Sequence, residues 1–167
     1  RDRGAHVRGL CRYTSRASRG GLEELDPGRD VEVVFGDVRE PEALIRACSG
    51  ADYVFHLAAH IGIPWSYESP RDVIETNVLG TLNVCQAVRD TGLTRLVHVS
   101  TSEVYGEPQA LPITEEHPIA PRSPYAASKA SADHVVAGHA AAFGLPAVVV
   151  RPFNTYGPGQ AARAVLP

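Results

Sequence analysis

Tyr125 and Lys129 are the residues whose types and spacing most directly suggest chemistry. They enclose the segment Tyr-Ala-Ala-Ser-Lys, which follows Ser123-Pro124, a pair typical of a helix start. Side chains four positions apart share one face of a helix, so the ammonium can lie beside the phenol. A neighbouring cation lowers the pKa of a tyrosine from its usual value of about 10, which lets the oxygen take a proton from a hydroxyl group. The alternative is an ordinary helix with a half-buried tyrosine and an exposed lysine.

The second candidate is Thr101-Ser102-Glu103, where two hydroxyls and a carboxylate follow an apolar run. Three further apolar runs end in small or polar residues, at 36–39, 56–60 and 151–158. Ligands of parallel α/β sheets bind at the carboxyl ends of the strands, so these four segments are the expected place of a site. Alternatively, Glu103 only caps a loop or forms a salt bridge there.

The apolar runs themselves predict a parallel sheet. We expect strands at 6–12, 31–36, 52–58, 95–101 and 146–151, several of them almost wholly apolar, as when both faces of a sheet are covered. Helices are expected at 41–49, 69–91 and 123–143, the last two ending before Gly92 and Gly144. This alternation predicts an α/β fold with a doubly wound parallel sheet.

The composition excludes several classes of protein. The 167 residues are 44% hydrophobic and 21% charged, as in one globular domain, and the net charge of -3 gives no positive field for a nucleic acid. No apolar stretch reaches the roughly 20 residues that a membrane helix needs. Cys11, Cys48 and Cys85 form no CxxC pair, which favours the reducing cytoplasm. His56 and His60 lack the rest of a zinc motif, so we expect no metal site.

A phosphate-binding loop of the G-x-G-x-x-G type does not occur between a first strand and a first helix. Methionine is also absent, including at position 1. We therefore expect residues 1–167 to be a partial dinucleotide-binding domain that lacks the first strand and the glycine loop. On this expectation the substrate domain is largely absent and the chain alone is inactive.

The chain resembles the extended short-chain dehydrogenase/reductases, specifically the NAD-dependent epimerase/dehydratase family of nucleotide-sugar enzymes. The resemblance rests on segments in family order: Gly36-Asp37-Val38, His56-Leu57-Ala58-Ala59, Thr76-Asn77-Val78 with Gly80-Thr81, the run 100–106, Ser123-Pro124-Tyr125 through Lys129, and Arg151-Pro152-Phe153-Asn154 through Pro158. It implies a Rossmann-type fold with NAD or NADP as cofactor. The most similar members are 4,6-dehydratases of the GDP-mannose and N-acetylglucosamine nucleotide type.

The resemblance also implies roles for single residues. Tyr125 would take the proton of the sugar C4 hydroxyl as hydride leaves C4 for the nicotinamide, and Lys129 would hold the nicotinamide ribose and lower the pKa of Tyr125. Thr101 would bind the sugar O4, and Asn154 would contact the sugar nucleotide. The cofactor would lie along Asp37 and Val38 at the adenine and along Leu57, Ala58 and Ala59 at the pyrophosphate and ribose.

Glu103 distinguishes the activities within the family. Dehydratases carry an acid after the Ser/Thr, because they also remove the C5 proton and expel the C6 hydroxyl, whereas epimerases of this type have none there. Ser102 stands where many relatives have Asp, so Glu103 would serve both steps. A nucleotide-sugar 4-epimerase or another oxidoreductase of the family is the nearest alternative. A non-catalytic nucleotide-sensing scaffold is the second, and the intact Tyr125, Lys129 and Glu103 argue against it.

Two expectations concern the cofactor and the assembly. Arg12 and Arg16 lie where an acidic residue would bind the free ribose 2′-OH of NAD, which favours NADP, although solvated arginines would leave the choice open. Relatives pair the helices expected at 69–91 and 123–143 across a dimer, so we expect a homodimer of the full-length protein that acts on a nucleotide sugar.

Overall fold

The computed structural model describes residues 4–14, 22 and 31–157, and Arg16 and Pro158 lie outside this part of the chain. Strands and helices alternate along it. The elements are β1 (Arg8–Cys11), β2 (Glu32–Phe35), α1 (Pro41–Cys48), β3 (Tyr53–His56), α2 (Ile63–Glu68), α3 (Pro70–Ile74), the π-helical η2 (Glu75–Leu79), α4 (Gly80–Thr91), β4 (Arg95–Val99), the 3-10 helix η3 (Ser102–Tyr105), α5 (Pro124–Phe143) and β5 (Ala147–Val150). Each strand and helix expected from the sequence is present, and the short helices α2 and η3 were not expected.

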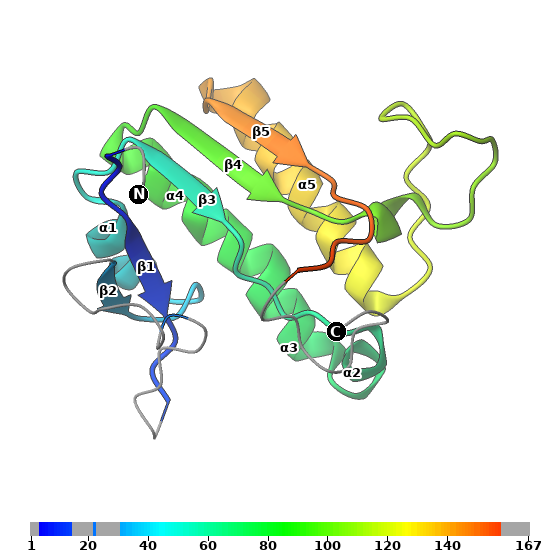
Figure 1. Cartoon of the computed structure of the whole chain (residues 1–167), viewed down its shortest axis with the longest axis horizontal. Helices are drawn as coiled ribbons and strands as arrows, with labels where there is room; N and C mark the ends of the chain where they lie inside the picture. Colours follow the sequence, from blue (N-terminus) through cyan, green and yellow to red (C-terminus); the bar gives the residue numbers. More distant parts are fainter. Residues whose placement is uncertain (1–3, 15–21, 23–30, 158–167) are drawn as a thin grey trace.

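The strands form two parallel sheets that run in one direction (Figure 1). β1 pairs with β2, with Gly9 opposite Val33, and β4 lies between β3 and β5, with Val97 opposite both Phe55 and Val148. Within the described residues, β1 does not pair with β3, and no strand joins the two sheets. In the doubly wound order 3-2-1-4-5-6, β1 and β2 correspond to positions 2 and 3, and β3 to β5 correspond to positions 4 to 6. The gap between the two sheets therefore falls at position 1, in agreement with the expected fold.

One face of the three-stranded sheet forms the core. Val54, Leu96 and Val149 pack with apolar residues of α4 and α5, among them Val88 and Val136. The alternate strand residues point the other way, as the two-residue period of a strand requires. Tyr53, Phe55, Val148 and Val150 on that second face are 40% to 65% exposed, and no helix of the described ranges covers them. In the described part of the chain, helices therefore cover only one face of the three-stranded sheet.

Local signals explain where the two long helices begin and end. Ser123 caps α5 by accepting a hydrogen bond from the Ala126 amide at 3.0 Å, and Pro124 occupies the first turn. Gly144 ends α5 with φ 66° and Gly92 ends α4 with φ 67°, a left-handed conformation that glycine adopts without strain.

The helix expected at 69–91 contains the π-helical turn η2 between α3 and α4. A π turn holds one more residue than an α turn, and such turns occur often at functional sites. The Thr81 hydroxyl donates to the Asn77 carbonyl at 2.6 Å and so satisfies an acceptor inside the widened turn. The turn carries Thr76 and Asn77 to the loop that follows β3.

Candidate active site

The predicted site residues follow the carboxyl ends of all five strands. Arg12 follows β1, Asp37 and Val38 follow β2, Leu57 to Ala59 follow β3, Thr101 to Glu103 follow β4, and Asn154 follows β5. Because the strands of each sheet are parallel, these loops meet at one edge. Tyr125 and Lys129 come to the same edge from the first turns of α5.

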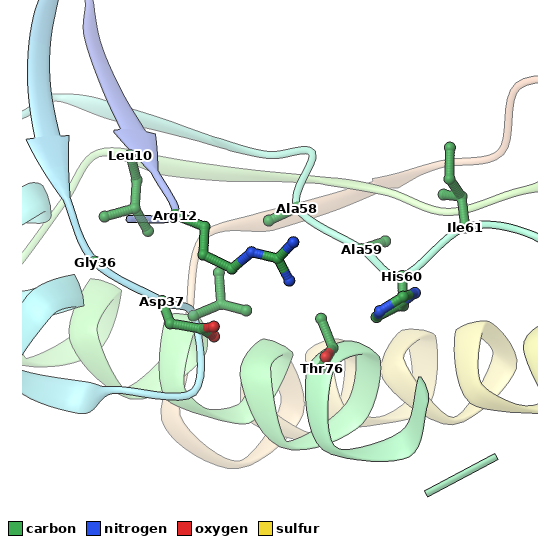
Figure 2. Close-up of a pocket in the computed structure, with 10 residues that line it drawn as sticks. Leu10, Arg12, Gly36, Asp37, Ala58, Ala59, His60, Ile61 and Thr76 are labelled. Atoms are coloured by element: carbon green, nitrogen blue, oxygen red, sulfur yellow. The ribbon is translucent and has the colours of Figure 1, made fainter. Parts of the chain in front are cut away.

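A pocket of about 360 Å³ lies between the ends of β1, β2 and β3 (Figure 2). Its walls are formed by Leu10, Arg12, Gly36, Asp37, Val38, Ala58, Ala59, His60, Ile61 and Thr76. Five of the predicted cofactor residues therefore line one pocket, and the side chain of Arg12 reaches into it above Asp37. Leu57 is not among the lining residues, and its side chain is 70% exposed.

Asp37 and Arg39 fix the charge at the rim of this pocket. The Asp37 carboxylate accepts from Arg39 Nη2 at 2.7 Å and from Arg39 Nε at 3.0 Å. These hydrogen bonds are the main reason why the pKa of Asp37 lies below its ordinary value, and the charge of Arg12 lowers it further. Arg39 also contacts Asp72 at 3.4 Å, and Asp72 contacts His60 Nε2 at 2.8 Å. The loops after β2 and β3 are thus linked through polar side chains.

Asn77 connects the pocket to the catalytic helix. Its Oδ1 accepts from the His60 amide at 2.7 Å, while its Nδ2 donates to the His60 carbonyl at 3.1 Å and to Ser128 Oγ at 2.9 Å. Asn77 is 1% exposed, so these contacts are shielded from water. Asn77 belongs to one of the family segments, but no role was predicted for it from the sequence. The π turn, which the sequence pattern does not reveal, directs it toward His60.

Tyr125, Thr101 and Glu103 come together beside α5. Burial raises the pKa of the half-buried Tyr125 phenol, the Thr101 side chain lowers it, and the charge of Glu103 raises it. Thr101 Oγ1 accepts from the Glu103 amide at 3.3 Å, which caps η3 and places the exposed Glu103 at the start of that helix. The phenol is therefore within electrostatic reach of the Thr101 hydroxyl and the Glu103 carboxylate.

The structure corrects one expectation about this site. The pKa of Tyr125 is raised, chiefly by burial, and not lowered by Lys129. Lys129 Nζ donates to the Val99 carbonyl at the end of β4 at 2.7 Å. A buried ammonium needs an acceptor, and this main-chain oxygen supplies one in the described structure. The spacing predicted that both residues lie on one helix face, but it did not predict this contact.

Lys129 itself is buried, with 3% of its surface exposed. Burial lowers the pKa of Lys129 to about 8, and the charge of Asp133 acts in the opposite direction. Ser102 is half-buried, and its amide donates to the Pro152 carbonyl at 3.2 Å, which ties the end of β4 to the end of β5. Asn154 lies exposed in the loop after β5.

A largely buried polar layer lies beneath Lys129, and most of its residues were not predicted from the sequence. Arg151 Nε lies 2.9 Å from Asp133 Oδ2, and Arg151 Nη1 donates to the Tyr105 hydroxyl at 3.1 Å. His98 Nε2 lies 3.3 Å from Asp133 Oδ1. The ring of His56 lies 5.3 Å from that of His98, centre to centre. Asp133 lies four positions beyond Lys129, which is a signal that sequence spacing could have supplied.

Burial keeps the histidines of this layer neutral. Burial lowers the pKa of His56 to about 3, and the pKa of His98 is lowered for the same main reason. His56 Nε2 is hydrogen-bonded to Thr81 Oγ1 at 2.9 Å. Across the described ranges, no three His, Cys, Asp or Glu side chains are grouped so that they could hold a metal ion. No helix there has the length and apolar character needed to cross a membrane.

The sequence matches the GDP-mannose 4,6-dehydratase family over residues 1–167. It is 40% identical to a UDP-glucose 4-epimerase of Streptomyces lividans over 133 residues, which are 78% of this chain and 40% of that relative. The chain thus spans half or less of that protein's length.

Two solved structures are similar in fold. The double mutant of the dTDP-glucose 4,6-dehydratase DesIV from Streptomyces venezuelae, solved with NAD bound, has a TM-score of 0.88 and 36% identity over 97% of this chain and 50% of that one. RMD from Pseudomonas aeruginosa, complexed with NADPH, has a TM-score of 0.74 and 31% identity over 95% of this chain and 58% of that one. Together with the parallel sheets, these matches establish a Rossmann-like fold.

Proposed function

Because the chain belongs to the GDP-mannose 4,6-dehydratase family, we propose that residues 1–167 are the partial dinucleotide-binding domain of a nucleotide-sugar 4,6-dehydratase. The reaction oxidises the sugar at C4, eliminates water across C5 and C6, and reduces C6. The solved relatives that carry NAD or NADPH support the same cofactor class for this chain.

The pocket after β1, β2 and β3 fits the adenosine end of such a cofactor. Val38 and Ala58 offer apolar surface, and the ionised Asp37 and the cationic Arg12 offer polar contacts in the same pocket. Ala58 and Ala59 carry no large side chain, so the main chain is open to a phosphate or ribose. When bound, NAD(P) supplies the hydride acceptor for C4 and the hydride donor for C6.

The residues around α5 supply the proton chemistry. Tyr125 takes the proton of the C4 hydroxyl, and Thr101, whose side chain lowers the pKa of Tyr125, holds the same oxygen of the sugar. A raised phenol pKa makes Tyr125 a poor base by itself, so the positive charge of Lys129 has to favour the phenolate when substrate is bound. Asn154 contacts the sugar nucleotide from the loop after β5.

Glu103 carries the dehydratase assignment. Its charge raises the pKa of the Tyr125 phenol, which supports a carboxylate within electrostatic reach of the C4 base. A ketone at C4 acidifies the hydrogen at C5, and a carboxylate beside it takes that proton and returns it to the departing C6 hydroxyl. Ser102, with no acidic group, leaves both proton transfers to Glu103.

The test is Glu103→Gln in the full-length protein. Wild type is expected to convert a nucleotide sugar to the 4-keto-6-deoxy product, seen by its absorbance in alkali, and the variant is expected to lose at least about 100-fold in rate, the usual contribution of a general acid-base group. Glu107→Gln is the matched control, because Glu107 is an exposed glutamate of the following loop that contacts Arg122 at 3.2 Å. An undiminished rate in Glu103→Gln would refute the role of Glu103.

A 4-epimerase is the second candidate, supported by the relative from Streptomyces lividans. Dehydration removes the C5 hydrogen to solvent, whereas epimerisation at C4 leaves every other carbon-bound hydrogen in place. The reaction in D₂O therefore separates the two. Deuterium at C5 of a 6-deoxy product supports the dehydratase, and a C4 epimer without deuterium supports the epimerase.

The assembly and the compartment are part of the same proposal. We expect a homodimer of the full-length protein, paired through the helices that contain α4 and α5, and sedimentation of the purified protein measures it. A cytoplasmic location is supported by the thiols of Cys11, Cys48 and Cys85, all of which are free.

A further inference from the structure

Lys129 is the only lysine among the 167 residues, beside fifteen arginines. It lies at the site with 3% exposure, and Nζ donates to a neutral acceptor, the Val99 carbonyl. A buried ammonium without a counter-charge gives up its proton, because burial disfavours the charged form. A neutral Lys129 could not favour the phenolate of Tyr125. Some anion must therefore keep Lys129 charged.

The acidic groups near Lys129 are few among the described residues. Glu103 on η3 is exposed and acts on Tyr125, where its charge opposes the phenolate. Asp133 lies one helical turn beyond Lys129 on α5, is 3% exposed, and its charge raises the pKa of Lys129. Of the other elements packed against this region, β4 and β3 contribute His98 and His56, which burial keeps neutral. The residue after β5 is the cation Arg151, which donates to the Tyr105 hydroxyl of η3.

Asp133 is held where its charge can act. Arg151 Nε lies 2.9 Å from Asp133 Oδ2, and the guanidinium also contacts the Tyr105 hydroxyl and lies 5.2 Å from the centre of the Tyr105 ring. Oδ1 is buried and makes no hydrogen bond among the described residues, and Nε2 of the neutral His98 lies 3.3 Å from it. Arg151 therefore anchors the carboxylate through Oδ2.

The layer around Asp133 has an excess of positive charge. Lys129 and Arg151 are positive, Asp133 is negative and the buried histidines are neutral, so the layer carries one net positive charge. The phenolate of Tyr125 would offset this excess, while the exposed Glu103 opposes it. Without Asp133 the layer would hold Lys129 and the half-buried Arg151 but no anion, and burial would favour the neutral form of Lys129.

We propose that Asp133 is a positioning residue of this site: anchored by Arg151, it keeps the Lys129 ammonium charged so that Lys129 can support the ionisation of Tyr125. The inference rests on the proposed function for the role of Tyr125, but the charge of Lys129 is measurable without turnover.

The experiment follows the ε-carbon of Lys129 by NMR in the full-length protein labelled with [ε-¹³C]lysine, with the signal assigned from its loss in Lys129→Gln. In Asp133→Asn the pKa of Lys129 is expected to fall by about one unit or more, since a buried counter-charge is removed. Asp133→Glu keeps the charge and is expected to restore most of the value. Asp90→Asn, which breaks the exposed contact between Asp90 and Arg89 at 2.9 Å, is the matched control and is expected to change nothing.

Arg151→Gln distinguishes an electrostatic from a structural role. Without the guanidinium, the Asp133 charge acts more strongly on Lys129, so the pKa of Lys129 is expected to rise. General damage to the layer would instead shift the pKa of Lys129 in the same direction in Asp133→Asn and in Arg151→Gln. If Asp133→Asn does not fold, Asp133→Ser replaces it, and the pKa of Lys129 is again expected to fall. An unchanged pKa of Lys129 in Asp133→Asn, or a fall in Arg151→Gln, overturns the inference. If the pKa of Lys129 shifts as expected but the full-length protein converts no nucleotide sugar, the proposed function is refuted and the inference about Asp133 stands.

Discussion

Lys129 shows how burial at one residue links the site to stability. The folded protein binds the Lys129 proton only below a pKa of about 8, whereas the unfolded chain holds it up to about 10.5. Between these values the unfolded chain carries the extra proton, so the free energy of unfolding rises with pH. Below pH 8 the buried charge costs about 3 kcal/mol, because each pKa unit corresponds to about 1.4 kcal/mol.

We therefore predict that Lys129→Met removes this rise. The free energy of unfolding of the full-length wild type and variant is measured with urea from neutral pH to above 10.5. As the pH increases, the difference between the two is expected to change by about 3 kcal/mol in favour of the wild type. Burial raises the pKa of Cys85 to about 11, so the titration of Cys85 lowers the free energy of unfolding in the same pH range. This contribution is the same in both proteins and cancels in the difference. A constant difference would contradict the prediction.

Arg12 is the residue that would select the cofactor. Its side chain lies in the pocket with Asp37, and no carboxylate follows β1 within the described residues 12–14. An arginine there suits the 2′-phosphate of NADP. We predict that Arg12→Gln weakens NADP binding by about tenfold or more, as expected for one charged hydrogen bond, and leaves NAD binding nearly unchanged. Calorimetry with both cofactors measures it, and equal losses for the two would assign Arg12 a general electrostatic role.

At the scale of elements, the start of α4 lies directly against the loop that follows β2. A Cβ at Gly80 would lie 2.8 Å from Val38 Cγ2, closer than real Cβ contacts come, and 3.3 Å from Val38 Cβ, which is a tight contact. Asn83 Nδ2 donates to the Val38 carbonyl at 3.1 Å and holds the two segments together. Gly80 thus lets the helix approach a wall of the cofactor pocket.

We predict that Gly80→Ala lowers the free energy of unfolding by about 1–3 kcal/mol through overpacking and weakens NAD(P) binding, because Val38 has to move. Gly138→Ala is the control, since nothing lies within 4 Å of a Cβ at this exposed position of α5. There the better helix propensity of alanine is expected to stabilise the protein by about 0.5–1 kcal/mol. Effects of the same sign in both variants would show that helix propensity, and not the contact with Val38, decides.

At the scale of the whole molecule, the described structure leaves apolar surface uncovered. β1 and β3 present unpaired edges, and Tyr53, Phe55, Val148 and Val150 lie exposed on the second face of the sheet. Exposed apolar surface of this kind is rare on stable monomers. Net stabilities of domains are only about 5–15 kcal/mol, so an uncovered face of the sheet is enough to prevent cooperative folding.

We predict that residues 1–167, produced alone, show no single sharp thermal transition, bind a dye for apolar surface, and do not bind NAD(P) in the micromolar range. Calorimetry and dye fluorescence measure this, with the full-length protein as the reference that unfolds cooperatively. A sharp transition without dye binding would show that the helical layer on one face suffices for folding.

The amino-acid sequence determined the local features of this protein. Strands, the starts and ends of helices and the polar strand ends follow from patterns and turn residues within a few positions, and Gly92, Ser123 and Gly144 act where the sequence places them. The family segments added the candidate residues. Of the six strand-end positions predicted at the cofactor, five line the pocket, and Leu57 does not. The five are Arg12, Asp37, Val38, Ala58 and Ala59.

Tertiary structure decided which partner each polar group has. The π turn that directs Asn77 to His60, the contact of Lys129 with the Val99 carbonyl, and the ion pair of Asp133 with Arg151 join residues that are 17 to 30 positions apart. Such pairings depend on which atoms remain near each other after the helices pack on the sheet, and burial then sets the charges. Local spacing cannot contain that information, because the cost of burying a charge is fixed by all the elements that surround it.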